Sequence, residues 1–385
     1  MRILEITSTY PPSVGGIQYY VQSLSQYLAL RGHHVQVLTV NTDNALDKEV
    51  SPQGFSIRRS KLDHKLYRAV ISSEFASQLL SAKNYDVYHI HIPFHVGLEL
   101  ASLAALINRI PLVVTHHGQD TRGGLLYTIL ANSYSIFYRV ISLWNTRTFI
   151  FLTRSYGQSL WLPPFVRRRV RIVRTGADIS RFSPDIDGSP IRQQYDLRAT
   201  TPLVAFVGSL RAGNRYKGVD YLIRAMRLVR ERLPEAKLLV VGGGELVGEF
   251  KALSQHLELQ EAVIFAGSID NQLLPTYYAA ADVFVLPSIS GPENSPVVVF
   301  EAMASAKPVV ASCLPGLLDI VQDNQTGFLV PIKDIDKLAT AIANLLIDAP
   351  LRNKMGHTAR LFAETYSWDR CALEMERIFQ ELTLC

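Results

Sequence analysis

Short apolar runs alternate along the chain with longer stretches in which apolar residues recur at helical spacing. In the first half, the runs at residues 2–8, 85–93 and 110–120 have the length of strands, and a helical stretch follows the first of them over residues 17–30. A strand, a helix and a further strand in succession predict a βαβ unit, in which the strands are parallel and the helices cover the sheet. The first half is therefore expected to be an α/β domain.

The same alternation starts again after residue 200. A Pro-, Gly- and Asp-rich segment, SPDIDGSP, precedes this second series, whose strands include residues 202–210, 262–270 and 281–288. Two consecutive doubly wound, Rossmann-like domains are the economical architecture, with a ligand site in the cleft between them. The expected boundaries are residues 1–190 for the first domain, residues 199–366 for the second, and residues 367–385 for a last helix that packs back on the first.

The stretch from residue 291 to 310 carries two carboxylates, Glu293 and Glu301, on either side of an expected helix start. Ser295 is a favourable N-cap residue and Pro296 suits the first helical position, so the helix is predicted to begin there. Glu293 would then lie in the loop after the strand at 281–288, at the edge of the sheet where α/β proteins bind ligands. The free N–H groups of this helix end would suit a phosphate.

Three further loops that follow predicted strands carry candidate residues of a ligand site. Arg211 and Lys217 lie in a Gly-containing loop after the strand at 202–210, where two long cations could hold a diphosphate from both sides. Gly15 and Gly16 form a strand-to-helix turn, which is either structural or allows close approach of a phosphate. His117 ends a predicted strand and is expected to face the ligand, whereas strand alternation sends its neighbour His116 the other way.

Residues 55–82 begin with a basic patch and continue into an expected amphipathic helix over residues 64–82. This surface is either a solvated helix face or a surface that docks on an anionic membrane. The apolar stretch at residues 121–150 is expected to be a helix and then a strand, either core or a contact for an acceptor or lipid. The basic patch consists of Arg58, Arg59, Lys61, Lys65 and Arg68.

The composition limits the classes of protein to which the chain can belong. The chain has 385 residues, of which 48% are apolar, and its net charge of +5 implies a modest attraction to anions without any nucleic-acid-binding pattern. It lacks an apolar run long enough to span a membrane, and its first residues form a strand rather than a signal peptide, so a cytoplasmic protein is expected. The three cysteines have no metal or redox spacing and are expected to be reduced thiols.

Two Asp-x-Asp strings could suggest a metal site. Asp185 and Asp187 lie in the inter-domain segment, and Asp334 and Asp336 lie at a helix start, where acidic residues are common in any case. Neither pair is expected to bind a metal, and metal-independent chemistry is expected.

Ten ordered segments over essentially the whole chain resemble the retaining GT-B glycosyltransferases of glycosyltransferase family four. They are PPSVGGIQ (11–18), RGHHVQVLT (31–39), DVYHIHIP (86–93), THHG (115–118), GADISRFSP (176–184), FVGSLRAGNRYKG (206–218), FAGSI (265–269), ADVFVLPS (281–288), ENSPVVVFEAMA (293–304) and QTGFLVP (325–331).

The resemblance implies transfer of a sugar from a UDP- or GDP-sugar to a saccharide, lipid-linked or small-molecule acceptor, without a cofactor. Glu301 would accept hydrogen bonds from the ribose, Glu293 would contact the donor sugar, and Gly16 would let the diphosphate approach. The implied catalytic residues are His117, Glu293, Arg211 and Lys217. The implied donor-binding residues are Gly15, Gly16, Gly208, Gly267, Ser268, Ile269, Asn294, Ser295, Pro296, Val297 and Glu301.

The sequence departs from the family pattern at Ala306, where Gly is usual, at Asp319, where Glu is common, and after Glu293, where Asn-Ser-Pro replaces a Gly-containing segment. The last departure leaves open which sugar hydroxyl is read. A sugar-nucleotide epimerase on the same plan and a non-catalytic, membrane-docked binding protein remain alternatives. Conversion of the donor without an acceptor would identify the first, and tight binding without turnover the second.

Overall fold

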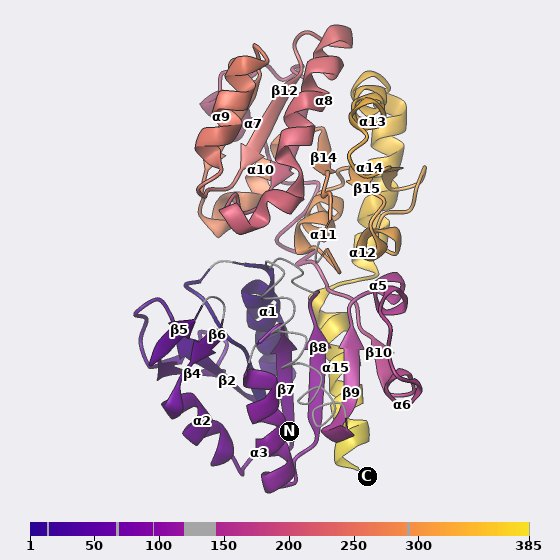
Figure 1. Ribbon diagram of the computed structural model, residues 1–385. Coiled ribbons are helices and arrows are strands. Elements are labelled where there is room, and N and C mark those ends of the chain that lie inside the picture. The colour runs from indigo at the N-terminus through magenta and orange to yellow at the C-terminus, as the bar shows by residue number, and fades with distance from the viewer. Residues whose placement is uncertain (14, 67–68, 95, 119–143, 291–292, 385) are drawn as a thin grey trace. The chain divides into compact units, whose positions relative to one another are not determined.

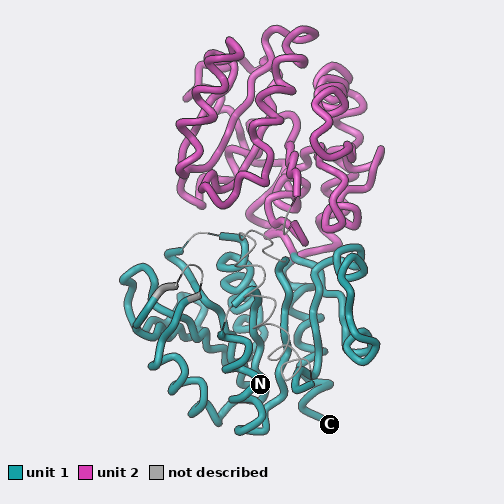
Figure 2. Tube along the Cα trace, viewed as in Figure 1, with its two compact units in different colours: residues 1–175, 368–385 teal, residues 176–367 magenta. Residues whose placement is uncertain are grey.

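The computed structural model describes the chain except for residues 14, 67–68, 95, 119–143, 291–292 and 385 (Figure 1). The chain forms two compact units, which are described separately: unit 1 comprises Met1–Thr175 with Trp368–Cys385, and unit 2 comprises Gly176–Ser367 (Figure 2). Residues 176–190, placed in the first domain by the sequence pattern, belong to unit 2. Phe182 explains this assignment, because its ring is fully buried and packs 5.7 Å from that of Tyr278.

Unit 1 is built on an eight-stranded sheet in the order β10-β9-β8-β7-β1-β2-β4-β3, in which β3 alone runs antiparallel to its neighbour. The chain first builds outward from β1 through β2 and then returns to the other side of β1 with β7. The neighbours β1 and β7 therefore mark the point where the strand order reverses. The strands are β1 (Arg2–Ile6), β2 (His34–Asn41), β3 (Lys48–Val50), β4 (Ser56–Lys61), β7 (Val87–Ile92), β8 (Leu112–His116), β9 (Thr146–Phe151) and β10 (Val170–Ile172).

The two faces of this sheet differ in chemistry. One face carries Leu4, Ile6 and Ile90 into an apolar core shared with α2 and α3. The opposite face lies against α1 and α15, which pack on each other and bring Tyr20 and Phe379 against polar side chains of the sheet. The helices of unit 1 are α1 (Gly16–Leu30), α2 (Ser73–Leu80), α3 (Gly97–Asn108), α5 (Arg154–Ser159), α6 (Pro164–Arg167) and α15 (Trp368–Thr383).

The last helix, α15, is held on α1 by a buried aromatic contact and by ion pairs. The Trp368 ring is fully buried and lies 5.3 Å from that of Tyr20, edge to face. Arg31 at the end of α1 pairs with Glu376 at 2.7 Å and with Asp369 at 3.3 Å. One face of α15 is thus buried in unit 1.

The expectation of one amphipathic helix over residues 64–82 is wrong. The segment begins as a β-hairpin, β5 (His64–Leu66) with β6 (Ala69–Ile71), and only then continues as α2. Val70 and Ile71 are β-branched and favour the strand, and the Ser72 hydroxyl accepts a hydrogen bond from the Phe75 N–H at 3.0 Å, which starts the helix at this point.

Arg59 does not belong to a basic surface patch, and this expectation is also wrong. Its side chain is 5% exposed, pairs with Glu49 at 2.9 Å, and donates to the carbonyl groups of Leu46 and Pro11. Of the remaining patch residues, Lys61 is exposed and Arg58 is half-buried, whereas Arg68 lies outside the described residues. For Lys65 only the backbone, in β5, is described.

Unit 2 contains a six-stranded parallel sheet in the order β13-β12-β11-β14-β15-β16. Here the order reverses between β11 and β14, which are adjacent in the sheet but far apart in the chain. The strands are β11 (Leu203–Val207), β12 (Lys237–Val241), β13 (Val263–Gly267), β14 (Val283–Leu286), β15 (Val309–Ser312) and β16 (Gly327–Val330). Two parallel-sheet α/β units are therefore confirmed.

The helices of unit 2 connect these strands and bury one continuous apolar core with them. They are α7 (Ser189–Gln194), η1 (Ala212–Lys217), α8 (Val219–Arg232), α9 (Val247–His256), η2 (Asn271–Leu273), α10 (Leu274–Ala280), α11 (Val297–Ala304), α12 (Pro315–Leu318), α13 (Ile335–Ile347) and α14 (Ala349–Glu364).

Two tryptophans of unit 1 provide a matched test of the role of α15. Replacing the fully buried Trp368 with Ala should lower the free energy of unfolding by about 3–5 kcal/mol, because it removes a large ring and leaves a cavity. Trp161→Ala makes the same change at a side chain that is 82% exposed and should alter stability by less than about 0.5 kcal/mol. Chemical denaturation measures both, and equal stabilities of the two variants would contradict the packing of α15.

Candidate functional site

The order reversal in unit 2 brings a cation and a carboxylate together. Lys217 ends η1, which follows β11, and Glu293 follows β14, so both lie beyond the carboxyl ends of adjacent strands. The Lys217 Nζ lies 3.0 Å from Glu293 Oε1, and the Ser288 hydroxyl donates to the same oxygen at 3.0 Å. The structure thus joins two of the residues that the sequence predicted as catalytic.

The Lys217–Glu293 pair is largely withdrawn from water. The two side chains are 14% and 5% exposed. Burial alone would lower the pKa of Lys217, but the facing Glu293 carboxylate outweighs it and holds the pKa above its usual value. Lys217 therefore stays cationic, and each charge neutralises the other in the absence of a ligand.

Arg211, the second cation of the predicted clamp, is exposed at the residue before η1. The loop beside it is fastened by Glu245, whose carboxylate accepts a hydrogen bond from the Ala212 N–H at 2.9 Å. No contact of Arg211 with Lys217 or Glu293 is recorded within the described residues, and its role in the clamp stays a prediction.

Glycines expose bare backbone at the ends of β11, β12 and β13. The Gly208 N–H donates to the Val241 carbonyl and the Gly242 N–H to the Gly267 carbonyl, each at 2.9 Å. A Cβ on Gly242 would lie 1.9 Å from the Gly208 oxygen, so only glycine allows these loops to meet. Residues 242–244 were not singled out by the sequence reasoning, although three consecutive glycines after a buried strand are a usable signal.

The predicted start of the helix after Glu293 is wrong in detail. The helix α11 begins at Val297, one residue later than expected, and Ser295 does not cap it. The Ser295 hydroxyl is buried and has no hydrogen-bond partner within the described residues. Gly316, in α12, fixes this loop by close approach, because a Cβ there would lie 1.7 Å from the Glu293 carbonyl oxygen.

Glu301 lies in α11 with its side chain 3% exposed. Burial raises the pKa of Glu301 to about 7, although the hydrogen bond from Tyr278 and the charge of Arg181 act in the opposite direction. The Tyr278 hydroxyl lies 3.0 Å from Glu301 Oε2 and 3.2 Å from the Val298 carbonyl oxygen. Tyr278, which the sequence reasoning missed, therefore orients the carboxylate.

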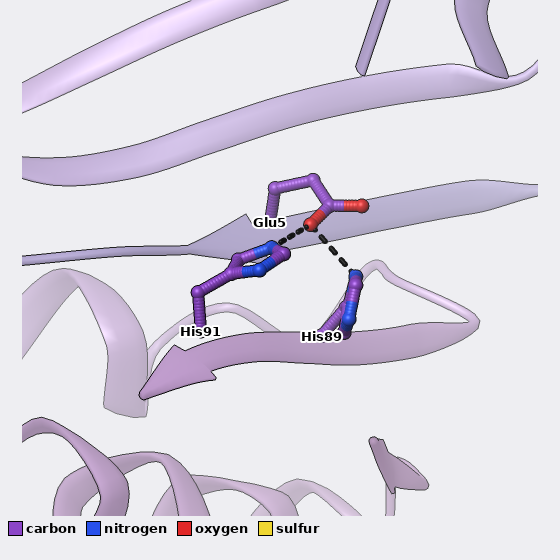
Figure 3. Close-up of side chains that lie close together, drawn as sticks. All are labelled: Glu5, His89 and His91. Carbon is purple, nitrogen blue, oxygen red and sulfur yellow. Dashed lines mark hydrogen bonds and ion pairs between the residues drawn. The ribbon is translucent and has the colours of Figure 1, made fainter. Parts of the chain in front are cut away.

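The order reversal in unit 1 holds a second polar cluster, drawn in Figure 3. Glu5 on β1 is the register partner of His89 on β7, and His91 follows two residues later on the same face. Glu5 Oε2 lies 2.8 Å from His89 Nδ1 and 2.6 Å from His91 Nε2. Burial would raise the pKa of Glu5, but the two histidines outweigh it and lower the pKa to about 2.

His117, predicted to face a ligand, is connected to this cluster. Its Nε2 lies 3.1 Å from His91 Nδ1, and the Tyr20 ring of α1 packs edge to face against it at 4.7 Å. Burial lowers the pKa of His91 to about 4 and holds the pKa of His117 well below its usual value. His116 stacks on Phe151 of β9, whose side chain belongs to the apolar core on the other face.

The atoms of Glu5, His89 and His91 that could bind a metal lie within 4.8 Å of one another. Both imidazoles approach Glu5 Oε2, but only His91 Nε2 is hydrogen-bonded to it, whereas His89 Nδ1 and Glu5 Oε1 are buried without a hydrogen-bond partner among the described residues. Elsewhere, Asp334 accepts a hydrogen bond from the Lys337 N–H and caps α13, and Asp187 accepts one from Ser189.

The remaining predicted residues lie at strand ends, in the loops that follow them or at helix starts. In unit 1, α1 begins at Gly16, which is exposed and where a Cβ would meet no atom within 4 Å. In unit 2, Ser268 and Ile269 follow Gly267, whose φ of +73° favours glycine. Gly15, Gly16 and His117 thus lie in unit 1, and the other predicted residues lie in unit 2.

Comparison with known proteins matches both halves of the chain to glycosyltransferases. Residues 14–181 match the model of Glycosyltransferase Family 4, and residues 188–362 match that of Glycosyl transferases group 1. The chain is 28% identical over 379 residues to the GDP-mannose-dependent alpha-(1-6)-phosphatidylinositol monomannoside mannosyltransferase of Mycolicibacterium smegmatis, with 95% of each protein covered.

Two solved structures share the fold over nearly their whole length. Sucrose-phosphate synthase from Thermosynechococcus elongatus is similar with a TM-score of 0.77 and 26% identity, and 99% of each chain is covered. Anabaena HepE, solved in complex with UDP, has a TM-score of 0.80 and 19% identity, with 99% of this chain and 100% of that chain covered. The chain is therefore a glycosyltransferase of family four, the glycosyl transferases group 1, with the two parallel-sheet domains of the GT-B fold.

Proposed function

We propose that the protein is a retaining glycosyltransferase that moves a sugar from a UDP- or GDP-sugar to a hydroxyl of a saccharide, lipid-linked or small-molecule acceptor without a metal. The observation that carries this proposal is the buried Lys217–Glu293 pair at the order reversal of unit 2. A cation and a carboxylate held together beside exposed glycine backbone can separate to receive an anion and a sugar hydroxyl. In a nucleotide sugar, the anionic diphosphate and the sugar lie on either side of the glycosidic bond that is broken.

Lys217 would stabilise the leaving group. Cleavage of the glycosidic bond leaves negative charge on the diphosphate, and a fixed cation with few waters around it stabilises that charge more strongly than an exposed one. When the diphosphate engages Lys217, the Glu293 carboxylate loses its partner and becomes free to accept hydrogen bonds from donor hydroxyls. The Gly208 and Gly242–Gly244 backbone would let the nucleotide approach without a side-chain clash.

Glu301 would bind the ribose. An ionised carboxylate has two oxygens that can accept hydrogen bonds from two neighbouring hydroxyls, and Tyr278 holds one of these oxygens in place. The roles of Gly16, His117, Arg211 and the segment Gly267–Ile269 stay as predicted from the sequence.

The anomeric configuration of the sugar would be retained because the acceptor oxygen attacks the sugar carbon on the same face from which the diphosphate leaves. The acceptor oxygen forms the new bond to the sugar carbon as the bond to the phosphate oxygen breaks, and that phosphate oxygen takes the acceptor proton. This scheme needs neither a covalent intermediate on the protein nor a metal, and Lys217 supplies the charge that a metal would otherwise supply.

The acceptor class is supported by a relative and by a hollow in unit 1. The Mycolicibacterium smegmatis enzyme is named for transfer to a phosphatidylinositol monomannoside. In unit 1, a hollow of about 580 Å³ between β5–β6 and the starts of α2 and α3 is lined by apolar side chains, among them Phe75 and Phe94, and by polar and charged ones, among them Lys61 and Asp63. The apolar part of this hollow would suit the lipid of a lipid-linked acceptor.

Association with an anionic membrane surface rests on fewer residues than the sequence suggested, because Arg59 is buried. Lys61 and Arg58 remain from the described part of the patch. No helix among the described residues is both long and apolar enough to cross a membrane.

The function is tested by a thermal-shift panel of nucleotide sugars followed by product analysis. A ligand at 100 times its dissociation constant adds roughly 2.7 kcal/mol of stability, so a UDP- or GDP-sugar that binds should raise the melting temperature. Nuclear magnetic resonance of the product should then show the same anomeric configuration as the donor. Inversion of that configuration would contradict the proposal, as would donor conversion without any acceptor.

Alanine variants of Lys217 and Arg211 compare the contribution of a buried cation to catalysis with that of an exposed one. Lys217→Ala should lower kcat by about 10²- to 10³-fold, because it removes a buried charge that stabilises the leaving diphosphate. Arg211→Ala should have a smaller effect, since the Arg211 side chain is exposed and solvent screens its charge. Steady-state kinetics of both variants measure this difference, and full activity in the double variant would exclude the clamp.

The raised pKa of Glu301 predicts pH-dependent donor binding. Below about pH 7 the free protein holds a proton on Glu301 that must leave before the carboxylate accepts both ribose hydroxyls. The dissociation constant for a nucleoside diphosphate should therefore rise as the pH falls through 7, by up to about tenfold per pH unit. Tyr278→Phe should move this midpoint upward, because it removes the hydrogen bond that favours the ionised form.

Glu301→Gln is the control for this titration. It removes the titrating group and should weaken binding at high pH while abolishing this pH dependence. Calorimetric titration with the nucleoside diphosphate from pH 5.5 to 8.5 compares the unmodified protein with Tyr278→Phe and Glu301→Gln. A dependence that persists in Glu301→Gln would assign the titration to another group.

A further inference from the structure

Five polar residues share one face of the unit 1 sheet across three adjacent strands. Glu5 lies on β1, His89 and His91 lie on β7, and Thr115 lies on β8 as the register partner of His91. His117 lies two residues beyond Thr115, and strand alternation returns it to this face. The opposite face of the same strands is apolar. A polar row buried beneath α1 and α15 is costly, the more so because Glu5 Oε1 and His89 Nδ1 have no hydrogen-bond partner among the described residues, which points to a role other than packing.

The hydrogen bonds along this row have only one consistent direction. An ionised Glu5 is an acceptor only, so the His91 nitrogen that faces it at 2.6 Å, Nε2, must carry the proton. A neutral imidazole has one N–H, and His91 Nδ1 is therefore an acceptor. The His117 Nε2 at 3.1 Å must then be the donor to it. In a neutral His117 this leaves Nδ1 without a proton.

We propose that Glu5 and His91 are positioning residues for His117, which they hold with its Nε2 proton donated to His91 and its Nδ1 open as an acceptor for a substrate hydroxyl. The identity of that hydroxyl as one of the transferred sugar rests on the proposed function. The direction of the hydrogen bonds does not, because it follows from the Glu5 carboxylate, from the two distances and from a neutral His91, whose pKa burial lowers to about 4. In this arrangement His117 can accept from a sugar hydroxyl but cannot donate through Nδ1.

The hydrogen-bonded residues Glu5 and His91 orient His117 and do not act as a proton relay that ends on Glu5. Glu5 has a pKa of about 2, so its carboxylate is a poor final acceptor for a proton passed along the histidines. Burial keeps His117 a weak base as well. His89 shares Glu5 but continues to Thr115, whose hydroxyl lies 2.7 Å from His89 Nε2, and it has no part in the path from Glu5 to His117.

The protonation state of His117 can be measured directly in the unmodified protein. Nitrogen-15 nuclear magnetic resonance of protein labelled at histidine distinguishes a protonated ring nitrogen from a bare one, and His117→Asn assigns the signal. The expected result at pH 7 is a proton on Nε2 and none on Nδ1 of His117. A proton on His117 Nδ1, or a His91 signal that changes when a metal chelator is added, would overturn the proposal.

Three variants separate positioning from general support of the fold. His91→Phe keeps a ring of similar size but removes the acceptor, so His117 should populate both tautomers and kcat/KM should fall about tenfold, the worth of one hydrogen bond. His91→Asn places an amide oxygen near the former Nδ1 and should restore much of the Nε2–H tautomer and of the activity. His89→Phe is the matched control and should leave the tautomer of His117 unchanged.

The outcomes distinguish this proposal from the proposed function. If the tautomer is as expected but no nucleotide sugar is turned over, the hydrogen-bond direction stands and the function fails. If the enzyme turns over a sugar nucleotide and His91→Phe changes neither the tautomer nor the kinetics, the function stands and the positioning role fails. A tautomer shift of the same size in His89→Phe would also overturn the role of His91.

Discussion

The buried pairing of Lys217 with Glu293 is the interaction on which the chemistry proposed for unit 2 depends. Opposite charges at 14% and 5% exposure hold each other in place, and both come from loops that only a reversal of strand order brings together. Such a pair contributes little net stability, because desolvation offsets much of the attraction. Its value lies in keeping two reactive charges ready in a site that excludes much of the water.

The two units use the same topological device for different purposes. In unit 2 the reversal between β11 and β14 places a cation beside a carboxylate. In unit 1 the reversal between β1 and β7 places the carboxylate of Glu5 beside two histidines and connects it to His117. In the proposed function, one reversal assembles charge for a leaving group, and in the positioning role proposed for Glu5 and His91 the other fixes the proton on the His117 ring. Both follow from the divergence of the connecting helices, which leaves the strand ends open.

Much of this could be predicted from the sequence where the signal is local. The strands, the two α/β halves and the candidate residues Lys217 and Glu293 follow from apolar periodicity and from residue types at strand ends, but the contact between these two residues does not. The hairpin at residues 64–71 was missed because a helical repeat of apolar residues outweighed the preference of Val70 and Ile71 for strands. The expected cap at Ser295 is wrong because α11 begins one residue later, with Pro296 at the N-cap position, and the close approach of Gly316 to this loop is a tertiary contact that no local pattern shows.

The connection from Glu5 to His117 could not be predicted for a related reason. Glu5 and His91 are 86 positions apart, and only the register of β1 with β7 places them at 2.6 Å. A buried glutamate within an apolar strand is the one signal that the sequence offers, because such a residue needs a partner. The sequence does not say which residue that partner is.

The central claim is that Glu293 holds Lys217 until a diphosphate replaces it, and calorimetric titration of Glu293→Gln with UDP and GDP tests it most directly. Glutamine keeps the shape and the hydrogen bond from Ser288 but removes the charge that competes for Lys217. The account predicts that the nucleoside diphosphate that the unmodified protein binds will bind more tightly to Glu293→Gln, while sugar transfer is lost. Weaker or unchanged binding would show that Lys217 does not exchange Glu293 for the diphosphate.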